Sequence, residues 1–126
     1  MKTFLVDAVN TFVVDKCIFQ EMYDLLEQYP NRKIVVTNTN DEQMGLFGLQ
    51  NLPYEVFTLK HAPDKTDPGY FQTLLQTFAI LPEEIVYFEH NPEAVKSAQS
   101  VGITSYHYDP NKKDLAGLKR FLDASL

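Results

Sequence analysis

Cysteine and long apolar runs are almost absent from this sequence. Cys17 is the single cysteine, so an internal disulfide is excluded. No stretch approaches the roughly 18 apolar residues of a membrane span, and no basic segment with an apolar core precedes residue 20 to form a secretory signal. We therefore expect a cytoplasmic protein with no membrane contact.

Positive charge is also scarce. The chain has 11 Lys and Arg residues against 17 Asp and Glu residues, which gives a formal net charge of −6 and an isoelectric point near 4.9. A nucleic-acid-binding face needs basic residues concentrated on one surface, and here they are mostly dispersed. Nucleic acid is therefore not an expected partner.

The sequence does contain a regular alternation of short apolar runs and helical patterns. Strands are expected at residues 3–9, 33–37, 54–59, 85–88 and 103–106, and helices at 16–29, 41–49, 67–78, 91–101 and 115–122. This alternation predicts an α/β protein, a three-layer α/β/α Rossmann-like fold with a mainly parallel five-stranded sheet. The length suits a single domain, residues 1–126.

Two helix starts and one helix end carry clear local signals. Asp67 precedes Pro68, and Asn91 precedes Pro92, so each time a capping side chain stands before a proline at the first helical position. Gly102 suits the end of the helix that follows Asn91.

Polar side chains follow four of the expected strands. In a parallel sheet, functional groups gather beyond the carboxyl ends of the strands. The side chains expected together at this edge are Asp7, Thr37, Asn38, Lys65, Glu89, His90 and Asn91.

Four segments, in this order, resemble motifs of the haloacid dehalogenase superfamily, whose members are mostly phosphate-handling hydrolases. Asp7 with Thr11 four residues later is similar to the Asp-x-Asp-x-Thr loop, and Thr37 in "KIVVTN" stands where a Ser or Thr holds a phosphoryl oxygen. Lys65 in "DKTDPGYF" looks like the Lys-Pro-Asp-Pro-x-x-Phe segment, and "EEIVYFEHNPEAVKSAQSVGI" resembles the last motif. The resemblance implies a Rossmann-like core, here without a cap domain.

The resemblance also implies roles for the site residues. The superfamily's phosphatases use an aspartate nucleophile, groups that orient it, and acids that hold Mg²⁺. Carried over to this chain, the catalytic residues are Asp7, Lys65 and Thr37, the substrate-binding residues are Thr11, Asn38 and Asn91, and the metal ligands are Asp7, Glu89 and His90.

Three positions depart from the superfamily pattern. Val9 stands at the general acid/base position, His90 stands at a metal-binding acid, and Ala94 stands where a second acid often lies. An isopropyl group can neither protonate a leaving oxygen nor activate water. A set of Asp7, Glu89 and His90 suits a softer ion such as Zn²⁺, whereas Mg²⁺ prefers oxygen ligands. We therefore expect that no cofactor is bound. Mg²⁺ is the one ion whose binding the resemblance would allow.

These departures favour a pseudoenzyme with incomplete phosphatase machinery, non-catalytic or weakly active, that binds a partner protein or a phosphorylated ligand at the former active site. In such a protein Lys65 would form an ion pair with Asp7. The alternative is a hydrolase, of phosphatase or dehalogenase type, that uses Asp7 as a covalent nucleophile. The run "DAVNT" is similar to the dehalogenase loop, and halide leaves without a proton. Without a cap the site is open, and a homo-oligomer could close it.

Overall fold

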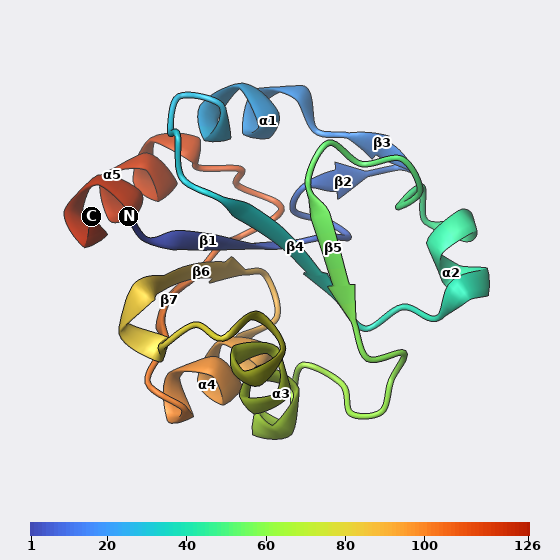
Figure 1. The fold of residues 1–126 in the computed structure, drawn as a ribbon. Helices are drawn as coiled ribbons and strands as arrows, with labels where there is room; N and C mark the ends of the chain where they lie inside the picture. The colour runs from blue at the N-terminus through green and yellow to red at the C-terminus, as the bar shows by residue number, and fades with distance from the viewer.

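The computed structural model describes residues 1–126 and contains one five-stranded parallel sheet with helices on both faces (Figure 1). In chain order the elements are β1 Thr3–Asp7, β2 Val13–Val14, β3 Cys17–Ile18, α1 Gln20–Leu26, β4 Lys33–Thr37, α2 Asp41–Leu46, β5 Glu55–Thr58, α3 Pro68–Phe78, the 3₁₀ helix η1 Pro82–Glu84, β6 Ile85–Glu89, α4 Pro92–Ser100, β7 Thr104–His107 and α5 Leu115–Ser125. The sheet order is β5-β4-β1-β6-β7. The predicted α/β fold is confirmed, and no cap domain is inserted between these elements.

The two helical layers bury the sheet from both sides. Helices α1 and α5 cover one face, and α3 and α4 cover the other (Figure 1). The side chains of β1 alternate between the layers: Phe4 and Val6 belong to the core cluster of α1 and α5, and Leu5 belongs to that of α3 and α4. All residues of β1 and β6 are buried, as expected for strands covered on both faces. None of the helices has the length and apolar character needed to cross a membrane.

The predicted helix starts and end are confirmed. Asp67 Oδ1 accepts a hydrogen bond from the backbone N of Gly69 at 2.8 Å, and Asn91 Oδ1 accepts one from the backbone N of Glu93 at 3.0 Å. Gly102 follows α4 with a φ of +91°, a conformation that glycine adopts without strain.

The prediction of a helix from residue 16 is wrong. Val13–Val14 pairs in antiparallel fashion with Cys17–Ile18, and α1 begins only at Gln20. The connecting residues Asp15 and Lys16 have φ values of 51° and 67°. A two-residue turn with positive φ at both positions matches the twist of a β-hairpin. The apolar spacing around residue 18 is compatible with a helix as well as with a strand, and the turn at Asp15 and Lys16 selects the hairpin.

The central strand lies where the direction of the chain across the sheet reverses. From β1 the chain moves to β4 and β5 on one side, and later to β6 and β7 on the other. Ligand sites of open α/β sheets lie at the carboxyl ends of the strands beside such a reversal. Asp7, Thr37 and Glu89 are the last residues of the three adjacent strands β1, β4 and β6. The topology therefore brings these side chains to one edge.

Candidate functional site

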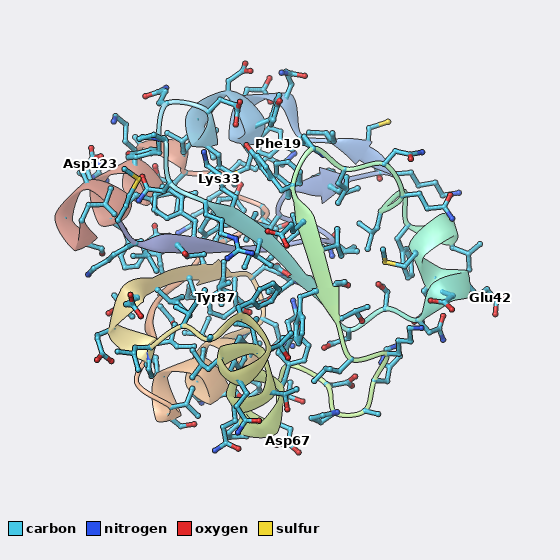
Figure 2. The ribbon with its side chains drawn as sticks, in the orientation of Figure 1. Phe19, Lys33, Glu42, Asp67, Tyr87 and Asp123 are labelled. Carbon is cyan, nitrogen blue, oxygen red and sulfur yellow. The ribbon has the colours of Figure 1, made fainter.

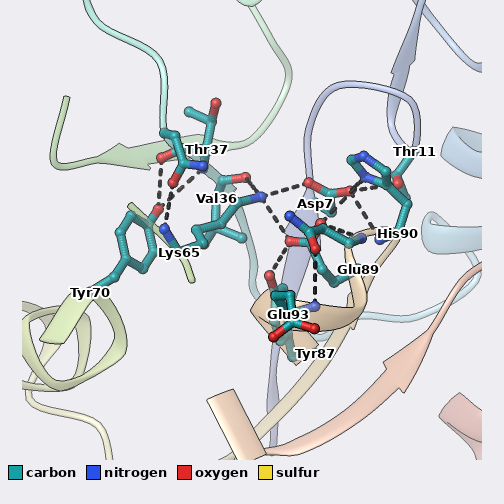
Figure 3. A network of polar contacts seen from close by, with 12 residues as sticks. Asp7, Thr11, Val36, Thr37, Lys65, Tyr70, Tyr87, Glu89, His90 and Glu93 are labelled. Atoms are coloured by element: carbon teal, nitrogen blue, oxygen red, sulfur yellow. Dashed lines mark hydrogen bonds and ion pairs between the residues drawn. The ribbon is translucent and has the colours of Figure 1, made fainter. Parts of the chain in front are cut away.

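Four ionisable side chains meet at the carboxyl edge of the sheet (Figure 3). Asp7 and Glu89 end β1 and β6, Lys65 lies in the loop between β5 and α3, and His90 precedes α4. The first three residues are at most 6% exposed, whereas the side chain of His90 is 29% exposed. Three buried groups and one group at the surface therefore share the site.

Both carboxylate oxygens of Asp7 have partners in the protein. Oδ1 accepts a hydrogen bond from Lys65 Nζ at 2.7 Å. Oδ2 accepts one from Thr11 Oγ1 at 2.7 Å and one from the backbone N of His90 at 3.3 Å, and it also contacts His90 Nδ1. Oδ2 is therefore crowded by Thr11 and His90, whereas Oδ1 has a single donor.

The ammonium group of Lys65 bridges the two buried acids. Nζ lies 2.7 Å from Asp7 Oδ1, 2.8 Å from Glu89 Oε1 and 3.3 Å from the carbonyl oxygen of Val36. An ammonium group has three N–H donors, so these three acceptors satisfy it fully. The ion pair that the sequence suggested between Lys65 and Asp7 is present.

Glu89 is held by four groups. Oε1 accepts hydrogen bonds from Lys65 and from the hydroxyl of Tyr87, which lies between the sheet and the layer of α3 and α4 (Figure 2). Oε2 accepts a bond from the backbone N of Asn91 at 3.1 Å and lies 3.3 Å from His90 Nδ1. The Glu89 carboxylate is therefore fixed by Lys65 and Tyr87 at one oxygen and by Asn91 and His90 at the other.

Burial and the neighbouring charges move the pKa values of the two acids in opposite directions. Burial raises the pKa of Asp7, but Lys65 and His90 outweigh it and hold this pKa well below its usual range. Burial and the charge of Asp7 raise the pKa of Glu89 to about 7, although Lys65 opposes them. The hydrogen bond with Asp7 raises the pKa of His90. Near neutral pH Asp7 is therefore an anion, Glu89 is partly protonated, and the hydrogen bond with Asp7 favours the protonated form of His90.

Thr37 and Asn38 connect the end of β4 to the rest of the site. The backbone N of Thr37 donates to the hydroxyl of Tyr70 at 3.1 Å, and its Oγ1 lies 3.1 Å from Oγ1 of Thr39. Asn38 Oδ1 accepts a hydrogen bond from the backbone N of Lys65 at 2.6 Å. Asn38 therefore fixes the loop that carries the bridging ammonium group.

A cavity of about 240 Å³ opens above this cluster. Thr11 does not line it, because this residue is fully buried and holds the Asp7 carboxylate from inside the protein. All the other catalytic, substrate-binding and metal-binding residues expected from the sequence border the cavity. The lining residues are Asp7, Val9, Thr37, Asn38, Thr39, Phe47, Lys65, Glu89, His90 and Asn91.

Sequence reasoning missed three hydroxyl groups of the site. The rings of Tyr70 and Tyr87 belong to the apolar core, so their spacing predicts packing and gives no sign of their polar contacts. The hydroxyl of Tyr70 contacts the backbone of Thr37, and that of Tyr87 contacts Glu89. Thr39 could have been found, because it lies two residues beyond a strand end that had already been identified.

No protein-family model and no curated protein matches the chain. Solved structures do match it. An uncharacterized protein from Corynebacterium glutamicum has a TM-score of 0.65 and 14% sequence identity, over 98% of this chain and 96% of its own. The core domain of a proposed phosphoglycolate phosphatase from Streptococcus pneumoniae has a TM-score of 0.64 and 16% identity, over 97% of this chain and 95% of its own.

A third match carries the superfamily's name. It is a haloacid dehalogenase (HAD) family enzyme from Bacteroides thetaiotaomicron, solved as a magnesium complex, with a TM-score of 0.64 and 21% identity over 82% of this chain. The chain has the HAD-like fold. It spans 58% of the length of the Bacteroides enzyme, and 52% of a proposed phosphoglycolate phosphatase from Lactobacillus plantarum that matches with a TM-score of 0.62.

The side chains of this site do not fit Mg²⁺. Asp7 and Glu89 supply the carboxylates, Lys65 already bridges them, and the third neighbouring ligand is the imidazole of His90. Mg²⁺ requires a nearly octahedral set of oxygen ligands and keeps several waters. The apolar side chain of Val9 lines the cavity and adds no further carboxylate. We therefore assign no magnesium-dependent step to this site.

Proposed function

We propose that this HAD-like protein is non-catalytic or weakly active and binds a phosphorylated ligand in the cavity above Asp7. The observation that carries the proposal is that Lys65, Thr11 and His90 all bind the Asp7 carboxylate, and that Thr11 and His90 crowd its Oδ2. A covalent nucleophile must present an oxygen to the reacting atom of its substrate. Here the carboxylate instead holds hydrogen-bond donors in place.

The lack of a proton-transfer group two residues after Asp7 also supports weak or absent turnover. Val9 lines the cavity two residues after the aspartate, and its side chain cannot exchange a proton with a leaving group or with water. General acid–base catalysis typically contributes about 10²- to 10⁴-fold to a rate. Its loss alone would therefore reduce a phosphatase to weak activity.

Phosphate is the ligand that the donors of the cavity favour. Asn38 and Asn91 each use the side-chain carbonyl oxygen to accept a backbone N–H, so their amide NH₂ groups stay available as donors. His90 directs Nδ1 toward Asp7, and its Nε2 has no partner in the protein. Charge-assisted bonds from such donors suit phosphate oxygens. The Bacteroides enzyme, one of the structural relatives, has been solved with magnesium and inorganic phosphate.

Phosphate binding can be measured by ¹H–¹⁵N NMR titration with inorganic phosphate and with a small phosphomonoester. We expect shifts of the amide signals of residues 37–38 and 89–91, and at least about tenfold weaker binding in Asn38→Ala, because one hydrogen bond to a charged ligand is lost. Asn111→Ala is a matched control, since Asn111 is exposed and lies outside this cavity. Equal losses in both variants would contradict the proposal.

A hydrolase that uses Asp7 is the alternative, and one observation favours it. Although burial raises the pKa of Asp7, Lys65 and His90 hold it well below its usual range, so the carboxylate is an anion, as a nucleophile must be. Intact-mass measurement after incubation with a panel of phosphate esters and haloacids tests this alternative. An adduct that disappears in Asp7→Asn would replace our proposal, whereas absence of adduct and turnover would support it.

A protein partner or a second copy of the chain is a further expectation, because an apolar pair lies beside the cavity. Phe47 lines the cavity and is 39% exposed, and its neighbour Leu46 is 54% exposed. Exposed apolar side chains next to a site suit contact with another protein. Light scattering over a wide concentration range tests self-association, and a monomer at every concentration would exclude it.

A further inference from the structure

The cavity above Asp7 has a polar floor and an apolar part at its mouth. Asp7 and Glu89 form the floor, since they are 1% and 0% exposed. Phe47 lines the same cavity but is 39% exposed, so it lies at the mouth. Val9 is the only other apolar residue of the lining. A ligand whose phosphate binds in the polar part therefore leaves its ester group beside Phe47 and Val9.

The ring of Phe47 takes no part in the core of the protein. It belongs to neither of the two core clusters, and it forms no ring pair with another aromatic residue. Helix α2, which Phe47 follows, has no buried residue and lies outside the two helical layers (Figure 1). The ring is therefore available for contact with a ligand.

The backbone on both sides of Phe47 is nevertheless fixed. At the start of α2, the side chains of Asn40 and Gln43 each accept a hydrogen bond from the other residue's backbone N at 3.0 Å. After the helix, Gly48 has a φ of +71°, and a β-carbon there would collide with the carbonyl oxygen of Lys16 in the hairpin. Contacts on both sides thus hold the ring at the mouth, which reduces the entropy that a ligand must remove on binding.

The size and lining of the cavity favour a small, flat ester group. Its volume of about 240 Å³ is below the roughly 300–1,000 Å³ of pockets that enclose drug-sized ligands. An aromatic ring can stack on Phe47, and it loses less conformational freedom than a flexible chain. A sugar or glycerol group would instead place hydroxyl groups against Phe47 and Val9, which cannot replace their hydrogen bonds to water.

We propose that the cavity selects aryl phosphates, in which the phosphate is attached to an aromatic ring, and that Phe47 determines this specificity. The inference deepens the proposed function and rests on it, because the phosphate group has to bind at the donors of Asn38 and Asn91. Phe47 then contacts the ring of the ligand at the mouth of the cavity. The second exposed apolar residue, Leu46, does not line the cavity and has no part in this contact.

NMR titration with methyl, butyl and phenyl phosphate tests the selection, because the three ligands differ only in the ester group. We expect phenyl phosphate to bind at least about tenfold more tightly than methyl phosphate, since stacking on an aromatic side chain stabilises a bound ring. It should also bind at least about threefold more tightly than butyl phosphate, because an aromatic pair contributes beyond its buried area. Equal affinity for phenyl and butyl phosphate would overturn the proposal.

Three variants assign the selection to the ring of Phe47. In Phe47→Ala the ratio of the affinities for phenyl and methyl phosphate should fall to about one. In Phe47→Leu, which keeps an apolar side chain, phenyl and butyl phosphate should bind alike. Leu46→Ala is the matched control and should keep the native ratios, since Leu46 is an exposed neighbour outside the cavity. Equal effects of Phe47→Ala and Leu46→Ala would contradict the assignment.

A measurement on the native protein keeps the proposal refutable if a variant folds poorly. In the complex with phenyl phosphate, nuclear Overhauser effects should connect the ring protons of the ligand with those of Phe47. Bound phenyl phosphate whose ring shows such effects only with other residues would overturn the proposal.

An aryl phosphate can be a free small molecule or the phosphorylated tyrosine side chain of a protein. A phosphotyrosine peptide, the same peptide with phosphoserine, and phenyl phosphate distinguish these sources. A phosphotyrosine peptide that binds at least as tightly as phenyl phosphate identifies a protein as the source, and weaker binding identifies a small molecule. The phosphoserine peptide should bind more weakly than the phosphotyrosine peptide, and the reverse order would refute the selection.

A failure of this inference can be told apart from a failure of the proposed function. Binding of methyl phosphate that is lost in Asn38→Ala, together with no preference for phenyl phosphate, removes the aromatic selection and keeps the phosphorylated ligand. No binding of any of the three esters removes the proposed function, and the selection falls with it.

Discussion

Replacing Lys65 with methionine removes one positive charge between two buried carboxylates and keeps most of the apolar volume of the side chain. In the native protein Nζ binds Asp7 Oδ1 at 2.7 Å and Glu89 Oε1 at 2.8 Å. In Lys65→Met these two oxygens lose their shared donor and face each other across an apolar side chain. We therefore expect the folded state to be strongly destabilised.

The size of the stability loss in Lys65→Met follows from the burial of the three charged side chains. The side chains of Lys65, Asp7 and Glu89 are 7%, 2% and 0% exposed. Removing one partner of a buried ion pair typically costs about 3–5 kcal/mol, because the remaining charge stays buried without compensation. Two features soften the loss here: His90 still contacts Asp7, and Glu89, with a pKa of about 7, can take up a proton. We expect the free energy of unfolding at pH 7 to fall by about 3 kcal/mol.

Urea unfolding followed by circular dichroism measures this change. Lys96→Met is the matched control, because Lys96 pairs with Glu93 at the surface with side chains 72% and 66% exposed. Such pairs contribute about 0–1 kcal/mol. Adding Glu89→Gln to Lys65→Met should restore part of the lost stability, since it removes one of the two facing carboxylates. A loss in Lys65→Met no larger than that of the control would refute our account of the site.

Three shorter predictions concern titration, positioning and catalysis. The pKa of Glu89 is about 7 in the folded protein and 4.5 ordinarily, so the folded state keeps a proton that the unfolded chain releases. Stability should therefore fall by up to about 1.4 kcal/mol per unit of pH between roughly pH 5 and 7, and Glu89→Gln should flatten this slope in urea titrations. Thr11→Val removes a donor to Asp7 at nearly constant volume and should cost about 1–3 kcal/mol in thermal unfolding. The double variant Val9→Asp/His90→Asp should gain Mg²⁺-dependent release of phosphate from a generic ester, at least about 100-fold above His90→Asp alone, because only the double variant has the acid/base carboxyl group.

The strands, and the gathering of the site residues at one edge of the sheet, were predictable because each follows from a simple rule. Short runs buried on both faces mark parallel strands, and functional groups in such a sheet gather at the strands' carboxyl ends. Asp7, Glu89 and His90 come from the ends of neighbouring strands, so their proximity required no knowledge of side-chain conformation. Lys65 was harder to place, and the superfamily resemblance supplied it.

The hairpin and the hydroxyl contacts were not predictable in the same way. The hairpin depends on Asp15 and Lys16 adopting positive φ. Aspartate is enriched in that region, but lysine gives no such signal. The contact between Tyr87 and Glu89 depends on the rotamer of a ring whose position in the sequence indicates only core packing. The contacts on both Asp7 oxygens come from three residues, Thr11, Lys65 and His90, and no single motif contains all of them.

Lys65 and His90 neutralise the two buried acids through different oxygens. Lys65 Nζ binds Asp7 Oδ1 and Glu89 Oε1, and His90 Nδ1 contacts Asp7 Oδ2 and lies 3.3 Å from Glu89 Oε2. Lys65 is buried, whereas the side chain of His90 is 29% exposed and lines the cavity. A ligand that enters the cavity can therefore displace the contact with His90 while the contact with Lys65 stays in place.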